Sequence, residues 1–259
     1  MSQVFLGRLQ AAIVCALAML AFGVAEMRAA GSGGSEDYAG AFLGVGKVAN
    51  EIVDIDGFAD WGNPGSTNKL NGPAAFAGVL AGRRLDMGSS GLRFEIDALA
   101  GSLSADTDEL DPTCNDETAS TRIRWMATAR MGFDMDVGST RIFLVGGPAL
   151  ARIDNSVTDI DYGGPGCLEG NLLFDEDDSF QSKGTRVGWT VGAGLEAPLS
   201  SRWSLRFDGT HFDFGRENYL VNESGNNRCG RGGEFRPCTY SLDNRGGMVR
   251  LMIFYRFKK

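Results

Sequence analysis

From Tyr38 onward, apolar segments of about ten residues recur along the chain, and within each segment apolar and polar positions alternate. A period of two places successive side chains on opposite faces of a β-strand. The last segment is the clearest case, because one of its faces is wholly apolar and the other carries Arg250 and Arg256. The residues of the apolar face are Val249, Leu251, Ile253, Tyr255 and Phe257. The pattern therefore predicts a succession of β-strands.

The gaps between these segments are alternately short and long. Short gaps rich in Gly, Asp, Pro and Ser lie at 86–91, 136–139 and 198–201. Long gaps lie near 49–72, 102–121, 154–183 and 215–245. Alternating turns and loops are typical of membrane barrels. Eight strands joined in this way place the start of the first strand and the end of the last strand at the same rim. We therefore expect an all-β fold, an eight-stranded antiparallel transmembrane β-barrel over 38–257 with long extracellular loops and short periplasmic turns.

The second face of most segments carries charge and glycine. In the fourth segment, for example, Ile123 and Trp125 alternate with Arg122, Arg124 and Arg130. The lumen of an eight-stranded barrel has room only for side chains that interlock, and confined charges must be paired. We therefore expect a lumen ion-pair network, which disfavours a wide pore. Its predicted members are Arg93, Glu95, Asp97, Arg124, Arg130, Glu196, Arg206, Asp208 and Arg250.

A soluble barrel with an apolar core and a charged outer face would show the same alternation. Two features favour the membrane: glycines gather on the polar face, and aromatic residues stand near strand ends, where lipid interfaces favour them. The predicted lipid-facing girdle consists of Trp125, Trp189, Trp203, Tyr255 and Phe257.

The N-terminus has the pattern of a secretory signal. Arg8 precedes the apolar stretch 11–24, which is shorter than the roughly 18 residues that a spanning helix needs. We expect a signal peptide over 1–25, with cleavage after Ala25 or as late as residue 30, and an export route to the outer membrane. A flexible segment over 26–37 then precedes the barrel, and 258–259 form a short tail.

Four cysteines remain after the signal, and all lie in the long gaps. In an exported protein an even number of cysteines indicates disulfides, although four cysteines permit three pairings. We favour a local bridge between Cys229 and Cys238, which leaves Cys114 to pair with Cys167.

Candidate chemistry is sparse. The first three long gaps are acidic and the fourth carries a slight excess of arginine. The acidic run 175–178 has no spacing typical of a calcium loop. His211 is the only histidine, and no partner motif accompanies it, so an interface side chain is the favoured interpretation over a general base. We therefore expect no catalytic residue, metal, cofactor or nucleic-acid partner.

Two hairpins resemble known families. The stretch 192–196 followed by 203–206 and 212–215 resembles the penultimate hairpin of small outer-membrane barrels, which include opacity-type proteins and the OmpA-like transmembrane domain. The stretch 130–132 followed by Gly146 and Gly147 resembles the alphaproteobacterial porin-family or immunogenic outer-membrane proteins.

The resemblance implies a non-enzymatic integral outer-membrane protein with a structural or surface-interaction role, such as envelope integrity, adhesion or host contact through its loops. The alternative is a narrow porin for passive diffusion of small solutes. The partners expected on this basis are outer-membrane lipid and lipopolysaccharide, the barrel-assembly machinery, and a host or surface ligand at the loops.

Overall fold

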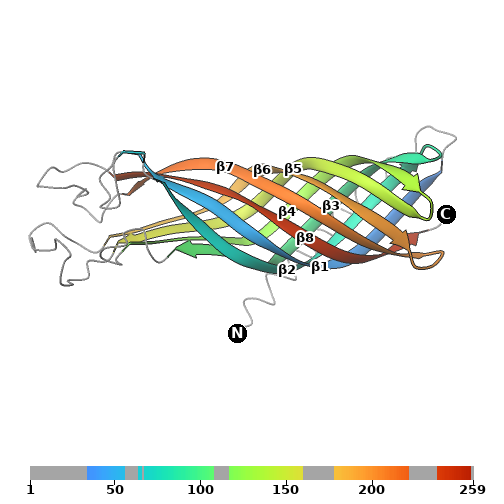
Figure 1. Cartoon of the computed structure of the whole chain (residues 1–259), viewed down its shortest axis with the longest axis horizontal. Coiled ribbons are helices and arrows are strands. Elements are labelled where there is room, and N and C mark those ends of the chain that lie inside the picture. The colour runs from blue at the N-terminus through green and yellow to red at the C-terminus, as the bar shows by residue number, and fades with distance from the viewer. Residues whose placement is uncertain are drawn as a thin grey trace, which may run out of the picture.

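The computed structural model describes residues 34–55, 64–65, 67–107, 117–159, 178–221 and 238–257. They form eight antiparallel strands in one closed barrel, each strand paired with its neighbours in sequence and β1 paired with β8 (Figure 1). The predicted fold class is thus confirmed. The strands are β1 (Ser35–Asp54), β2 (Thr67–Asp86), β3 (Ser90–Thr107), β4 (Glu117–Val137), β5 (Thr140–Asp159), β6 (Asp178–Pro198), β7 (Trp203–Val221) and β8 (Cys238–Phe257).

The connections have the predicted arrangement. The short turns that join β2 to β3, β4 to β5 and β6 to β7 lie at one end of the barrel, on the right in Figure 1. The start of β1 and the end of β8 meet at that same rim, where Asp37 pairs with Phe257. By the usual orientation of such barrels this rim is periplasmic, and the other end is extracellular.

The strands are longer than the sequence pattern predicted, with 18 to 21 residues each. The predicted bounds of all four long gaps were therefore wrong: β1 continues to Asp54, and β2 begins at Thr67. Likewise β3 and β4 extend through most of 102–121, and β7 and β8 extend deep into 215–245. The reason is that alternation continues beyond the apolar segments, but with its polarity reversed.

This reversal divides the barrel into two parts. In the part next to the short turns, outward side chains are apolar and exposed, as in Leu43 and Val187, and inward side chains are charged. In the part next to the long gaps, which we call the outer part, outward positions such as Lys69 and Lys183 are polar and exposed. Here most buried interior side chains are apolar, Leu70 among them, and a smaller number, such as Asn50 and Thr121, are polar. The outer part therefore has the polarity of a water-soluble barrel.

Inward glycines make room for aromatic rings. A methyl group on Gly78 would lie 2.3 Å from the Phe42 ring and 2.5 Å from the Ala98 carbonyl oxygen, and one on Gly44 would lie 2.3 Å from the Phe76 ring. The two rings meet edge to face, with centroids 6.4 Å apart. Each of these glycines is paired on the neighbouring strand with the residue whose ring lies over it, and so leaves room for that ring inside the narrow lumen.

Several predictions fall outside the described residues. They are the signal peptide 1–25, most of the segment 26–37, the tail 258–259, and Cys114, Cys167 and Cys229. Cys238 begins β8, but its side chain is not among those described. Across the described ranges, no helix has the length and apolar character needed to cross a membrane.

Candidate functional site

The barrel interior holds a charge cluster centred on Arg206 of β7. Its guanidinium donates hydrogen bonds to Glu95 on β3, at 2.6 Å, and to Glu196 on β6, at 3.2 Å. Glu95 also accepts a hydrogen bond of 2.7 Å from the Tyr38 hydroxyl. Arg206 has no exposed surface, and the two carboxylates are almost as deeply buried. Strands from different sides of the barrel are therefore tied together through its centre.

A second set of pairs adjoins the first. Arg250 on β8 binds both oxygens of Asp208, at 2.7 and 2.9 Å, and reaches Asp97 at 3.2 Å. Arg130 on β4 lies 2.8 Å from Asp97 and 3.0 Å from Glu95. Glu95 and Asp97 therefore link the two sets into one continuous network.

The network extends toward the short turns through residues that the sequence analysis missed. Asp134 on β4 accepts hydrogen bonds from Arg84, at 2.8 Å, and Arg93, at 3.0 Å. Arg141 on β5 lies 3.3 Å from Glu196. The sequence pattern could have identified Asp134, because it lies four positions from Arg130 and therefore on the same face of β4.

Aromatic rings fill the space around these charges. The Arg206 guanidinium carbon lies 4.8 Å from the centre of the Phe143 ring and 4.9 Å from that of Phe254. Arg93 lies 4.4 Å from the same Phe143 ring. Contacts of this kind stabilise a desolvated cation through the negative face of the ring.

Arg124 does not lie in the network, contrary to the sequence prediction. The register between β4 and β5 shifts between Ile123 and Trp125, which makes Arg124 the extra residue of a β-bulge. Beyond the bulge the two faces of β4 exchange, so Ile123 points inward and is fully buried. Arg122 and Arg124 are exposed, and Arg124 pairs with Asp154 of β5.

Above the charge network lies a layer of apolar side chains, which we call the apolar plug. They come from β8 and from β1 to β5, and each is at most 1 % exposed. The plug residues are Val48, Ile52, Leu70, Leu103, Ile123, Ile153 and Leu242. The interior is therefore filled at two levels by side chains of opposite character.

The predicted girdle residues all lie on the outer surface. At the periplasmic end, the Tyr255 ring contacts those of Trp203 and Phe257, with centroids 5.2 and 5.3 Å apart. At the other edge of the apolar band lie Trp125 and Trp189, both partly exposed. His211 is outward as well, with its ring centroid 5.4 Å from that of Trp189.

One carboxylate in the outer part has a shifted pKa. Burial raises the pKa of Asp243 above its usual range, and Arg245, 3.1 Å away, limits the rise. Asp243 also accepts a hydrogen bond of 2.6 Å from the Glu51 backbone N–H. Within the described residues no group of three or more His, Cys, Asp or Glu side chains could hold a metal ion.

Comparison with known proteins agrees with this geometry. The chain is 25% identical over 147 residues to the 31 kDa outer-membrane immunogenic protein of Brucella melitensis, a match that covers 55% of this chain and 50% of the Brucella protein. The chain thus matches about half the length of this curated relative. The crystal structure of the outer membrane protein OprG from Pseudomonas aeruginosa has a TM-score of 0.51 at 10% identity, covering 88% of this chain and 99% of OprG.

The outer membrane protease OmpT from Escherichia coli has a TM-score of 0.46 at 10% identity, covering 86% of this chain and 97% of OmpT.

The family model of the outer membrane protein β-barrel domain matches residues 14–232 of this chain. A lipid-facing apolar band, a closed barrel and this match agree on a location in the bacterial outer membrane. The chain belongs to the outer membrane protein β-barrel family.

Proposed function

We propose that this chain is a non-enzymatic outer-membrane barrel with a structural or surface-interaction role. The observation that carries the proposal is the filled interior. The charge network fills the part of the barrel next to the short turns, which has the apolar outer surface, and the apolar plug fills the outer part. With its lumen occupied, the barrel serves as an anchor. The function then belongs to the surface it presents outside the membrane.

The burial of the plug supports this proposal. Side chains that line an open aqueous channel are accessible to water, whereas Leu70, Leu103 and Ile123 have no exposed surface. The charges below them are equally buried, and Arg206 and Asp208 have none either. A solute would have to displace both a paired charge network and a packed apolar layer. Each of these is costly, because buried ion pairs and well-packed apolar groups resist separation.

The outer part supports a surface role. Its polar outward wall extends the strands beyond the lipid-facing band. We infer that envelope integrity, adhesion or host contact depends on this wall and on the connections it carries. The first 25 residues are proposed as the signal for export, and the barrel-assembly machinery as the partner in insertion.

A non-enzymatic role is favoured by the position of His211. The family consists mostly of non-enzymatic outer-membrane barrels. The His211 side chain lies against Trp189 on the outer face, and a general base must instead reach the proton it removes within a substrate site. We expect His211→Ala to leave any peptidase activity of purified outer membranes unchanged.

The alternative function is a narrow porin for small solutes. Single-channel recording of the folded protein in planar bilayers separates the two functions. Absence of steady conductance steps supports the structural or surface role, and regular steps support the porin.

The predicted disulfides are tested separately, by mass spectrometry of the exported protein. We propose Cys229–Cys238 and Cys114–Cys167 bridges, and free thiols or a link between Cys114 and Cys229 would contradict that pairing.

A further inference from the structure

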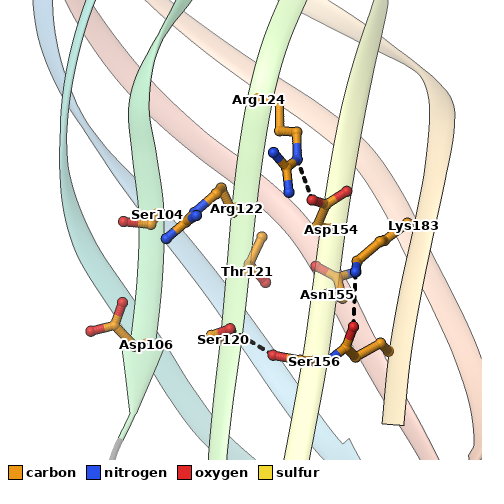
Figure 2. A pocket seen from close by; sticks show the side chains of 11 residues that line it. Ser104, Asp106, Ser120, Thr121, Arg122, Arg124, Asp154, Asn155, Ser156 and Lys183 are labelled. Atoms are coloured by element: carbon orange, nitrogen blue, oxygen red, sulfur yellow. Dashed lines mark hydrogen bonds and ion pairs between the residues drawn. The ribbon is translucent and has the colours of Figure 1, made fainter. Parts of the chain in front are cut away.

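A polar pocket of about 250 Å³ lies in the wall of the outer part, across β3 to β6. Figure 2 shows Arg122 pointing from β4 toward Ser104 of β3, Arg124 turned toward Asp154, and Lys183 reaching in from β6. Hydroxyl and amide groups and a second carboxylate, Asp106 of β3, complete the lining. Cationic and neutral donor groups from neighbouring strands therefore converge on one site.

The strand register places an upper row of residues at the pocket and a lower row directly beneath it. In the lower row Trp125 of β4 is opposite Arg152 of β5, which is opposite Thr185 of β6. In the upper row Arg122 is opposite Asp154, which is opposite Lys183. The bulge places Arg124 between the rows and turns it outward. It is thus the bulge that brings Arg122 and Arg124 to the outer surface.

The height of the site is fixed by the apolar band beneath it. Outward side chains on β4 are apolar from Trp125 to Met135, a run of about ten residues, which spans about 25 Å in a strand tilted by about 45°. This is the height of the apolar band in outer-membrane barrels. The same band ends at Leu150 on β5 and Val187 on β6. The cationic rows therefore begin where hydrocarbon gives way to headgroups.

The charges of the pocket are only partly balanced. Arg122, Arg124 and Lys183 stand against two carboxylates, Asp106 and Asp154. Asp154 pairs with Arg124 and lies 3.9 Å from Arg152 below the pocket. Arg122 makes no ion pair with any described residue, and Lys183 donates its hydrogen bond of 2.8 Å to neutral Gln181. Arginine and lysine beside hydroxyl donors suit a phosphate group, because a guanidinium fork matches its oxygens.

We propose that this pocket binds a phosphate group of lipopolysaccharide in the outer leaflet. Arg122, Arg124 and Lys183 supply the charge, Arg152 and Thr185 lie at the lipid boundary, and Trp125 packs beside the acyl chains. The inference goes beyond the proposed surface role, because it concerns a lipid held by the barrel wall. Either can fail without the other.

The test uses the full protein extracted from outer membranes and exchanged into detergent. Native mass spectrometry would compare binding of phosphorylated lipid A with binding of lipid A stripped of its phosphates. We expect the triple variant Arg122→Ala, Arg124→Ala, Lys183→Ala to bind phosphorylated lipid A at least about tenfold more weakly, since a loss of about 1.4 kcal/mol already has that effect. Stripped lipid A should bind both proteins equally weakly.

The matched control removes three exposed cations from the opposite wall, in the variant Lys47→Ala, Lys69→Ala, Arg245→Ala. We expect this control to keep wild-type affinity at equal change in net charge. A heat-dependent shift in gel mobility verifies that both variants are folded. Equal weakening in both triple variants, equal binding of stripped lipid A by the wild type, or a preference for inorganic phosphate over lipid A would each overturn the proposal.

Discussion

The Arg206 guanidinium donates a hydrogen bond of 2.6 Å to Glu95 across the interior of the barrel. The two residues are 111 positions apart, on β7 and β3, which are four strands apart in a ring of eight and so lie on opposite walls. Such a contact spans the lumen instead of joining neighbouring strands. It adds to the stability of the closed barrel and, at the same time, occupies the route that a solute would take.

Replacing Arg206 by methionine should therefore strongly destabilise the folded barrel. The Arg206→Met change leaves Glu95 and Glu196 with fewer partners in a buried site, and breaking such pairs typically costs about 3–5 kcal/mol. Urea unfolding in lipid vesicles, followed by tryptophan fluorescence, measures the loss. Arg202→Met removes an exposed arginine at the periplasmic turn, together with its surface hydrogen bond of 2.8 Å to the Tyr255 hydroxyl, and should change the free energy of unfolding by less than about 1 kcal/mol. Equal effects of the two substitutions would contradict the role of the network.

Ion conductance should appear only when the charge network and the apolar plug are both disrupted by mutation. The charge network is opened by Glu95→Ala with Arg206→Ala, and the apolar plug by Ile123→Ala with Leu242→Ala, on strands four apart. Because the two barriers act in series, each double variant alone should remain silent in planar bilayers, and the combined variant should show steady steps. Steps of equal size from the charge-network variant alone would show that the plug does not block ions.

Parity along a strand explains how much of this arrangement the sequence could predict. Glu95 and Arg250 lie inward because alternation within one strand fixes the face of each residue. Arg124 could not be placed in this way, because a bulge is a relation between neighbouring strands that single-strand alternation does not contain. The strand ends could not be predicted for another reason: at Ile123 the apolar face moves from outside to inside, so the outward apolar run ends before the strand does.

Adding one methyl group at Gly78 should disturb the interior more than adding it at Gly209. A Cβ at Gly78 would meet the Phe42 ring and the Ala98 backbone, whereas one at Gly209 would have no described atom within 4 Å. Overpacking of this kind typically costs about 1–3 kcal/mol, so Gly78→Ala should lower the urea midpoint and Gly209→Ala should not. If the two variants unfold at the same midpoint, the inward glycines do not act by making room for the rings.

The stability contributed by Asp243 should depend on pH. Burial raises the pKa of this carboxyl in the folded state, so its ionised form disfavours folding. Its stabilising contribution is complete below the pKa of the unfolded chain and is lost as pH rises through the folded pKa. The asparagine of Asp243→Asn does not titrate, so the free energy of unfolding of the variant relative to wild type should be higher at pH 7 than at pH 3.

The control is Asp213→Asn, which changes a half-buried outward residue of β7. A relative free energy that is the same at both pH values, or that changes in the opposite direction, would show that the arginines beside Asp243 outweigh its burial.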